Sequence, residues 1–275
     1  MSPMNPMSPM NPSDLDPRRF FSLEGKSALI SGATGTLGEA VTLSLAQAGV
    51  KLTLCDRGQP KLDALAAKAR ALGASVATID RWPTSADDAA AIVGAAVAAH
   101  GGVDLMLMTN GTNIVADIVD MSPESWQSVM DANIGGPWLL CRAVGKQLIA
   151  QGRGGKVVLV SSTRGKLGHP AGYTGYCTSK AAIDGLVRTL GCEWGRYGIT
   201  VNAVGPTVFR SAVSAWMYAE DGPGKATREG MLQRIPMGRL GEPRDVVGGI
   251  LFLLSPASDF CTGQTLYLDG GYTAG

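Results

Sequence analysis

The sequence predicts a single α/β domain in which a doubly wound parallel sheet of about seven strands is flanked by helices. Short apolar runs alternate along the chain with longer segments whose apolar residues recur at the spacing of an α-helix. The apolar runs are continuous, which is typical of strands buried on both faces of a parallel sheet. A chain of 275 residues with 45% hydrophobic residues is long enough to build one such domain.

The first half of the chain predicts a series of strand–helix units. We place its strands at Ser27–Ser31, Lys51–Asp56, Ser75–Asp80 and Asp104–Thr109. The helices that follow them are expected near Leu37–Gly49, Lys61–Leu72, Ser85–His100 and Pro123–Ala150. This alternation is typical of βαβ units and therefore of a parallel sheet.

The second half continues the alternation and then interrupts it. Strands are predicted at Lys156–Ser162, Ile199–Pro206 and Thr265–Gly271, and helices at Tyr173–Tyr197 and Pro243–Leu254. The segment between Thr207 and Met237 has no clear period.

We expect residues 207–237 to form a mobile lid over the substrate, because they follow a strand that ends at the carboxyl edge of the sheet, where ligands bind in such folds. Trp216, Met217 and Tyr218 can cover an apolar substrate face, and Asp221-Gly222-Pro223-Gly224 is expected to be a flexible break. The alternative is a static helical hairpin used for subunit packing.

Residues 1–20 differ in composition from the rest of the chain. Two MSPMNP repeats open a stretch rich in Pro, Ser and Asn, which cannot bury enough apolar surface to offset the entropy of ordering it. We therefore expect a disordered tail over residues 1–20 and one domain, with no internal linker, over residues 21–275.

Charge and cysteine content argue against several classes of function. The 24 basic and 23 acidic residues give a net charge of +1, so no basic face for nucleic acid is indicated. No apolar run has the length of a membrane span, and no secretory signal is recognisable. Five scattered cysteines and two histidines give no metal-ligand pattern, and the odd cysteine count fits a reducing cytoplasm.

The segment SGATGTLG, Ser31–Gly38, lies between the first predicted strand and the first predicted helix. Glycines in such a turn let a pyrophosphate approach the amides at the helix N-terminus, where the helix dipole favours anions. The residues that we assign to cofactor binding here are Gly32, Gly35, Thr36, Leu37 and Gly38.

Asp56 ends the second predicted strand, a little over twenty residues further on. A carboxylate at this position accepts hydrogen bonds from both adenosine ribose hydroxyls and repels a 2′-phosphate, which predicts NAD as the cofactor. Arg57 is the neighbour that softens this preference. The structural alternative is a solvent-facing aspartate at a strand end.

The segment YCTSK, Tyr176–Lys180, lies on a predicted helix after a strand that ends in VLVSS. Residues four apart share one helix face, so Tyr176 and Lys180 can address the same ligand. A phenol with a pKa of about 10 is a poor proton carrier at neutral pH, and a nearby ammonium lowers that pKa. Ser162 can hydrogen-bond the substrate oxygen. Without this context, a Tyr-x-x-x-Lys pair is usually an ordinary amphipathic pair.

Together these segments resemble the short-chain dehydrogenase/reductase family, in particular its gluconate 5-dehydrogenase-like and 3-oxoacyl-carrier-protein reductase-like members. The resemblance covers nearly the whole chain from about Phe21. The matching features, in family order, are the Gly-rich turn, Asp56, Asp80, Asn133 in DANIGG, Ser162, YCTSK, Asn202 with Pro206, and RLGEP before the last helix.

The resemblance implies a Rossmann fold and a catalytic tetrad. In this tetrad, Tyr176 is the acid/base, and Lys180 lowers its pKa and holds the nicotinamide ribose. Ser162 positions the substrate oxygen, and Asn133 supports a water-linked proton relay. The further cofactor contacts that the resemblance implies are Asp80, Asn110, Gly111, Pro206, Phe209 and Ser211.

A homotetramer is also expected. The two long predicted helices, Pro123–Ala150 and Tyr173–Tyr197, carry apolar residues on more than one face, so one face covers the sheet and another needs a partner. The family resemblance implies four subunits, with these helices at one dimer interface and the C-terminal strand region at another.

The sequence departs from the family pattern at several positions. Thr36 stands where the middle glycine of the turn is usual, and Gly35 precedes it. The stretch after the fourth strand is Met108–Gly111 in place of Asn-Asn-Ala-Gly. Ser162 lies one residue further from Tyr176 than is usual, which predicts a bulged loop, and Thr207 replaces a glycine.

These features predict an NAD(H)-dependent oxidoreductase that transfers a hydride between the nicotinamide and a secondary alcohol or ketone, with a sugar acid or polyol as substrate. The alternatives are an NADPH-dependent 3-oxoacyl-carrier-protein reductase and a catalytically silent cofactor-binding regulator. Arg164, His169 and Arg210 are close in sequence to the site. They can receive a substrate carboxylate, or they are solvated loop or interface residues.

Overall fold

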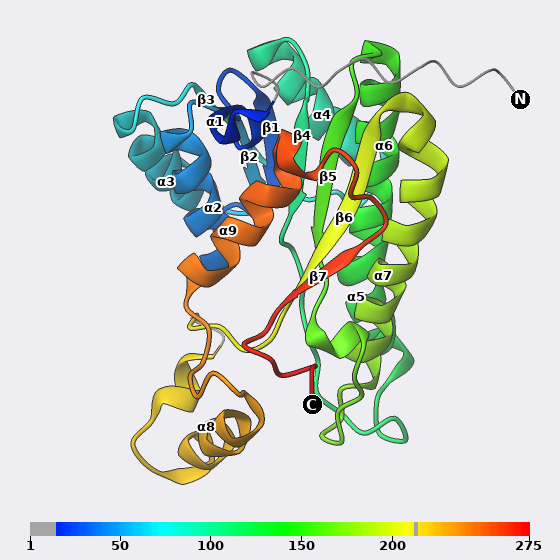
Figure 1. Ribbon diagram of the computed structural model, residues 1–275. Helices are drawn as coiled ribbons and strands as arrows, with labels where there is room; N and C mark the ends of the chain where they lie inside the picture. The colour runs from blue at the N-terminus through cyan, green and yellow to red at the C-terminus, as the bar shows by residue number, and fades with distance from the viewer. Residues whose placement is uncertain (1–14, 212–213) are drawn as a thin grey trace, which may run out of the picture.

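The computed structural model describes residues 15–211 and 214–275, and a seven-stranded parallel sheet lies at its centre (Figure 1). The strands are β1 (Ser27–Ser31), β2 (Lys51–Asp56), β3 (Val76–Asp80), β4 (Leu105–Met108), β5 (Gly155–Val160), β6 (Ile199–Pro206) and β7 (Thr265–Leu268). Their order is β3-β2-β1-β4-β5-β6-β7, and every neighbouring pair is parallel. The expected fold class is confirmed.

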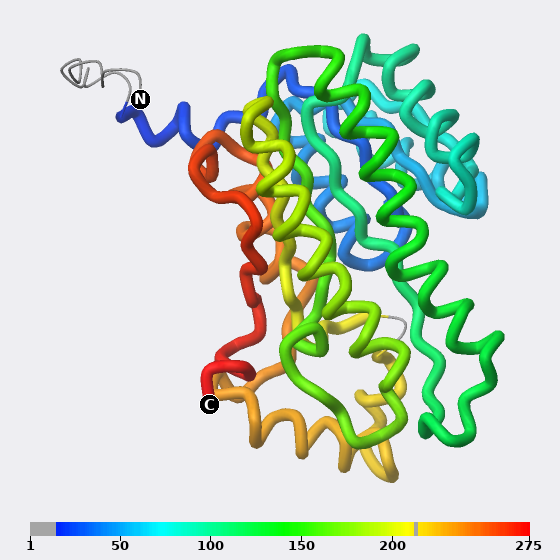
Figure 2. The backbone as a smooth tube through the Cα atoms, turned by 90° about the vertical axis from the view of Figure 1, so that its right-hand side faces the viewer, coloured from blue at the N-terminus to red at the C-terminus, as the bar shows by residue number. Residues whose placement is uncertain are grey.

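Helices cover both faces of this sheet because successive strand residues point to opposite sides. Ala28 and Ile30 of β1 pack in one hydrophobic cluster and Leu29 packs in the other. The first face carries α2 (Thr36–Gln47), α3 (Gln59–Ala71) and α9 (Pro243–Leu254). The second face carries α4 (Ala86–His100), α6 (Gly136–Gln151) and α7 (Thr174–Trp194), and Figure 2 looks onto α6 and α7.

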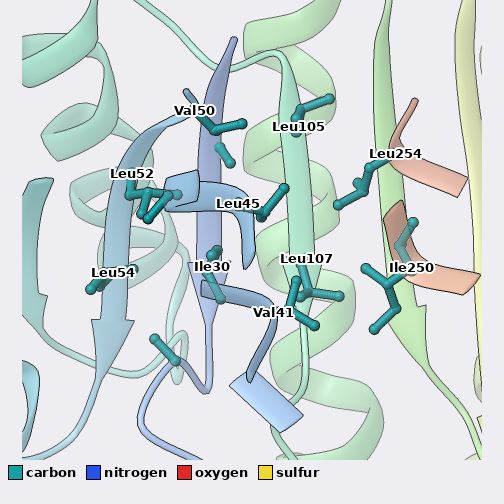
Figure 3. Close-up of a cluster of buried hydrophobic side chains, with 14 of the residues drawn as sticks. Ile30, Val41, Leu45, Val50, Leu52, Leu54, Leu105, Leu107, Ile250 and Leu254 are labelled. Atoms are coloured by element: carbon teal, nitrogen blue, oxygen red, sulfur yellow. The ribbon is translucent and has the colours of Figure 1, made fainter. Parts of the chain in front are cut away.

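The core beneath α2 and α9 holds the start of the chain's first βα unit in place. Figure 3 shows Ile30, Leu52 and Leu107 from the strands facing Leu45 of α2 and Ile250 of α9. These side chains are fully or almost fully buried. Burial of each contributes roughly 1.5–3 kcal/mol, so α2 is anchored firmly behind the turn that precedes it.

The long helix that was predicted over 123–150 is interrupted. The structure has α5 (Pro123–Met130), a π-helical turn over Asp131–Gly135, and then α6. Pro137 has no N–H, so the carbonyl of Asn133, four residues earlier, lacks the donor of a regular helix. A turn that contains glycine and precedes a proline accommodates this missing bond.

The segment 207–237 contains regular structure that its sequence pattern did not indicate. Ala215–Tyr218 forms a 3₁₀ turn, and Gly222–Arg234 forms α8, which lies beyond the carboxyl ends of the strands (Figure 1). Asp221 is the residue that precedes this helix and Pro223 lies in its first turn, so the expected flexible break is in fact a helix start. The hydrophobic periodicity did not predict this helix, because α8 buries Gly224 and has no stripe of apolar residues along its length.

The described chain begins with a short helix, α1 (Pro17–Phe20), capped by Asp16. The expected disordered tail therefore extends too far in including residues 17–20, and residues 1–14 lie outside the described residues. None of the helices over the described ranges is long and apolar enough to cross a membrane. The cysteines, all of which are described, are free thiols.

Candidate active site

The Gly-rich turn between β1 and α2 is shaped by two glycines that the protein's own packing requires. Gly32 has a φ of 77°, and a Cβ added to it would lie 2.5 Å from Thr109 Oγ1 and 2.8 Å from the Asn110 amide nitrogen. A Cβ at Gly38 would overlap the carbonyl oxygen of Gly32. No side chain can replace hydrogen at either position without moving backbone.

Gly35 differs from these two glycines because a Cβ there would meet, within the described part of the chain, no atom nearer than the Gly32 carbonyl oxygen at 3.4 Å. It precedes α2, and no described side chain caps this helix. The first-turn amides of Thr36, Leu37 and Gly38 therefore have no intrahelical acceptor. The turn leaves open space in front of a positive helix end, which fits an anion such as a pyrophosphate.

Asp56 at the end of β2 is nearly buried and heavily hydrogen-bonded. Its Oδ2 accepts from the Thr34 amide at 2.9 Å and the Thr34 hydroxyl at 2.6 Å. Its Oδ1 accepts from the Arg57 amide at 2.8 Å and Trp82 Nε1 at 3.0 Å. Burial raises the pKa of this carboxyl, but the four hydrogen bonds outweigh burial, so its pKa lies below the ordinary value. Asp56 is therefore ionised at neutral pH.

The side chains around Asp56 were only partly foreseen. Asp80 accepts from the amides of Gly58 and Gln59, both at 3.0 Å, and so binds the start of α3. The Arg57 guanidinium lies 4.4 Å from the centroid of the Trp82 ring. Thr34 and Trp82 were missed, although both follow strand ends that the sequence did predict.

Asn110 and Gly111 follow β4, next to the Gly-rich turn. Both side-chain polar atoms of Asn110 are buried and have no hydrogen-bond partner among residues 15–211 and 214–275. Buried polar groups are rarely left unpaired, so this amide marks a place where a ligand can supply the missing partners. A Cβ at Gly111 would lie 3.4 Å from Lys180 Nζ and 3.5 Å from Asn133 Oδ1, so this glycine adjoins the catalytic candidates.

Tyr176 and Lys180 lie one turn apart on α7, as predicted. The phenol of Tyr176 hydrogen-bonds with Ser162, and Lys180 Nζ lies 5.6 Å from the centroid of its ring. Lys180 Nζ donates to the Val160 carbonyl at 2.8 Å. The structure therefore brings the predicted Ser, Tyr and Lys together at the carboxyl end of β5.

The pKa of Tyr176 shifts in the direction opposite to the one expected. Burial is the largest effect and raises the pKa of the phenol, whereas its hydrogen bond with Ser162 and the positive charge of Arg164 lower it, and the net shift is upward. Burial also lowers the pKa of the Lys180 ammonium to about 8. Removal of water from the two adjacent groups, Tyr176 and Lys180, is thus the largest influence on their pKa values.

Ser162 reaches Tyr176 because the loop after β5 is tightened. Thr163–Gly165 forms a 3₁₀ turn, and Ser162 caps it, because the Ser162 Oγ accepts from the Arg164 amide at 3.1 Å. Gly165 packs so closely on Asp184 of α7 that a Cβ would overlap its carboxylate. The loop between Ser162 and Tyr176, for which the spacing predicted a bulge, thus begins with a compact turn.

The side chain of Asn133 is fully used in holding the site together. Its Oδ1 accepts from the Thr112 amide at 2.7 Å, and its Nδ2 donates to the Thr112 carbonyl at 2.8 Å and to Ser179 Oγ at 2.9 Å. It thus ties the loop after β4 to α7. The backbone carbonyl of Asn133, which has no donor at Pro137, is the atom of this residue that could serve a water-linked relay.

The predicted contacts after β6 lie on the same edge of the sheet. The Pro206 carbonyl faces Ser162 Oγ at 3.5 Å. Phe209 is buried in the core, and its carbonyl accepts from Ser214 Oγ at 2.7 Å. The hydroxyls of Ser211 and Ser214 lie 3.2 Å apart.

The three candidate substrate residues lie in different surroundings. Arg164 is buried, whereas Arg210 pairs with Glu242 at 3.1 Å and stacks on Tyr218. His169 lies against the ring of Tyr173 with 4.3 Å between centroids. The fixed partners of Arg210 leave it less free to receive a substrate carboxylate.

These features fit a nicotinamide dinucleotide better than a metal ion. No group of three or more potential ligands for a metal ion occurs within the described ranges. The ionised Asp56, the open space at Gly35 and the amide of Asn110, unpaired among the described residues, follow one another along the carboxyl edge of β2, β1 and β4. They match the pyrophosphate and ribose groups of such a cofactor.

Comparison with known proteins supports the same conclusion. The family model described as enoyl-(acyl carrier protein) reductase matches residues 32–273. An uncharacterized oxidoreductase of Mycobacterium tuberculosis is 52% identical over 92% of this chain and 93% of its own length. The 2-dehydro-3-deoxy-D-gluconate 5-dehydrogenase of Dickeya dadantii is 33% identical over 92% of this chain and 98% of its own length. The 3-oxoacyl-[acyl-carrier-protein] reductase of Thermotoga maritima is 36% identical over 90% of this chain and 98% of its own length.

Solved structures agree in fold along nearly the whole chain. A short-chain type dehydrogenase/reductase from Mycobacterium marinum has a TM-score of 0.85 and 29% identity, covering 97% of this chain and 100% of that one. A gluconate 5-dehydrogenase from Burkholderia cenocepacia, in complex with NADP and tartrate, has a TM-score of 0.87 and 29% identity. The match covers 94% of this chain and 98% of that one.

Proposed function

The chain belongs to the short-chain dehydrogenase/reductase family, and we propose that it is an NAD(H)-dependent enzyme that interconverts a secondary alcohol and a ketone of a sugar acid or polyol. Membership makes it an oxidoreductase of CH–OH groups that uses a nicotinamide cofactor. The observation that carries the proposal is the buried Tyr176 phenol, bonded to Ser162 and beside Lys180, at the edge where Asn110 is unpaired.

The residues at this edge have distinct tasks in the proposed reaction. The nicotinamide, when bound, accepts the hydride in oxidation and supplies it in reduction. Ser162 donates a hydrogen bond to the substrate oxygen. In reduction the Tyr176 phenol gives its proton to that oxygen and is reprotonated through the water-linked relay proposed at Asn133. In oxidation it accepts the hydroxyl proton as it passes its own proton to that relay. Lys180 has further N–H donors besides the one that binds Val160, and these can reach a ribose hydroxyl.

NAD is the proposed cofactor because Asp56 is ionised and ends β2, and an acidic side chain at that point of the fold repels a 2′-phosphate. A gluconate 5-dehydrogenase of similar fold was solved with NADP, and Arg57 beside Asp56 is the residue in this chain that would attract a phosphate. An NADPH-dependent 3-oxoacyl-carrier-protein reductase is therefore the second candidate, favoured by Arg57 and by the relative from Thermotoga maritima.

Steady-state kinetics with purified protein test these proposals. The substrates are sugar acids, polyols and a 3-oxoacyl thioester, each assayed with NAD(H) and NADP(H). We expect turnover of a sugar acid or polyol with NAD(H), and loss of that turnover in Tyr176→Phe with cofactor binding nearly intact. Tyr176→Phe activity above a few per cent of wild type would assign the acid/base role elsewhere. Cofactor binding without any turnover would favour a silent regulator.

A further inference from the structure

Among the described residues, a buried arginine beside the catalytic serine has only neutral hydrogen-bond partners. Arg164 is 9% exposed, and its guanidinium donates to the Gly168 carbonyl at 2.9 Å and to the Tyr272 hydroxyl at 3.0 Å. Over residues 15–211 and 214–275, no carboxylate lies within ion-pair distance of it. Burying a charge is costly unless an opposite charge compensates for it, so this site is incomplete without an anion.

Arg164 lies close to the reacting groups. Its amide donates to Ser162 Oγ at 3.1 Å, so the arginine and the serine share one short turn. The positive charge of Arg164 lowers the pKa of Tyr176 and of His169, which shows that its field extends to both the phenol and the imidazole. An anion bound by this guanidinium would therefore belong to the molecule that the catalytic residues hold.

A second cation approaches the same place from α8. Arg234, the last residue of that helix, has its guanidinium carbon 4.4 Å from the centroid of the Tyr272 ring, and that of Arg164 lies at 5.4 Å. No acidic side chain in the described part of the chain pairs with Arg234. Burial, then Arg164 and Arg234, lower the pKa of His169, so its imidazole is neutral at neutral pH and adds no charge.

We propose that Arg164 and Arg234 bind a carboxylate of the substrate, which makes this chain a dehydrogenase of hydroxy acids and a reductase of oxo acids rather than of neutral polyols. The inference rests on the proposed function and narrows its substrate class. A guanidinium has five N–H donors in a flat fork that matches two carboxylate oxygens, and Arg164 commits only two of its nitrogens to protein acceptors.

The placement of Arg234 links substrate binding to α8. Tyr272, fully buried, packs with Ile235 and Leu240 in a small cluster separate from the two main cores. A carboxylate that bridges Arg164 and Arg234 would join the loop after β5 to the end of α8. Binding of the acid would therefore hold α8 over the site.

Matched substrates and single-residue variants test the inference in the complete protein with its cofactor. We compare D-gluconate with D-glucitol, which differ in the group at C1, and D-glucitol 6-phosphate serves as the phosphate arm. In Arg164→Gln and Arg234→Gln, KM for the acid should rise about 10- to 100-fold, as expected for lost hydrogen bonds to a charged group. The rise in KM should be at least about 10-fold larger for the acid than for the neutral polyol. Lys225→Gln, which removes a positive charge from the other end of α8, is the matched control and should change neither value.

A binding measurement keeps the inference testable if neither compound is turned over. Isothermal titration of the protein saturated with cofactor should show D-gluconate binding that Arg234→Gln weakens at least about 10-fold and Lys225→Gln does not. Arg234 is exposed, so this variant is expected to fold even if Arg164→Gln does not.

Three outcomes would overturn the inference. They are equal affinity for D-gluconate and D-glucitol, unchanged gluconate affinity in Arg234→Gln, and tighter binding of the phosphate ester than of the acid. None of these results affects the proposed function, which instead fails if the wild-type protein binds the cofactor but turns over neither a sugar acid nor a polyol. The two failures are thus distinguishable.

Discussion

The ammonium group of Lys180 is buried, and burial disfavours its charged form. Its pKa falls to about 8 because α7, β5 and the loop after β4 exclude water from the ammonium. At neutral pH the group is still protonated, so the folded chain bears the cost of desolvating it. The shift from 10.5 to about 8 corresponds to about 3 kcal/mol.

We predict that Lys180→Met abolishes activity yet raises the free energy of unfolding at pH 7 by roughly 1–3 kcal/mol, after allowing for the unpaired Val160 carbonyl. The unfolded chain binds this proton more tightly than the folded chain does, so the cost is complete below about pH 8. It disappears as the pH rises from about 8 through 10.5. Urea denaturation of both proteins at pH 7 and pH 10 should show the difference shrink at the higher pH. A variant that is less stable than wild type at pH 7 would contradict the argument.

Asp56 is the residue on which cofactor preference depends. Because its carboxylate is ionised, Asp56→Asn should remove the repulsion of a 2′-phosphate and keep the side-chain volume. We expect the ratio of kcat/KM for NAD to that for NADP to fall at least about 10-fold. Arg57→Gln is the companion variant and should raise this ratio. A preference for NADP(H) in the wild-type protein would contradict the assignment.

The turn between β1 and α2 separates glycines needed for folding from a glycine left free for a ligand. Gly38→Ala places a Cβ against the Gly32 carbonyl and should destabilise the protein by about 2 kcal/mol or more. Gly35→Ala meets open space, so its stability should change by less than about 1 kcal/mol, while cofactor affinity falls at least about 10-fold. Thermal unfolding and cofactor titration of both variants measure the contrast. Unchanged cofactor affinity in Gly35→Ala would place the pyrophosphate elsewhere.

The helix α8 should move over the substrate site when ligands bind. It packs against the Ala215–Tyr218 turn, and it meets the rest of the chain at the small Tyr272 cluster. We expect amide exchange in α8 to be faster than in α9, which covers the main core, and to slow when NAD and D-gluconate are added. Equal protection with and without ligands would favour the static helical hairpin.

For the whole molecule, exposed apolar side chains favour self-association. Trp138 of α6 is 52% exposed, and Phe260, shortly before β7, is fully exposed. They lie in the two regions where we predicted interfaces. Sedimentation at micromolar concentration should give four times the 28.5 kDa chain mass, and Trp138→Glu with Phe260→Glu should lower it. A wild-type monomer would contradict the prediction.

The sequence alone determined the succession of strands and helices along the chain and the position of the Gly-rich turn. It also determined that Tyr176 and Lys180 share one face of a helix. Continuous apolar strands and helical periodicity are local patterns, and residues four apart share a helix face whatever surrounds them. It missed α8 because that helix has no apolar stripe, and the break at Asn133 because Pro137 acts through a hydrogen bond that a pattern of apolar residues does not record.

Only the tertiary structure decided the electrostatics of the site. The pKa of Tyr176 rises instead of falling because the folded chain removes water from the phenol, and burial depends on every element packed around it. Arg164 and Tyr272 stand 108 positions apart, and only folding shows that they share a hydrogen bond. It also shows that no acidic side chain in the described ranges pairs with Arg164. Chemistry that depends on contacts between distant segments is thus decided in three dimensions, whereas chemistry carried by neighbours in the chain is already present in the sequence.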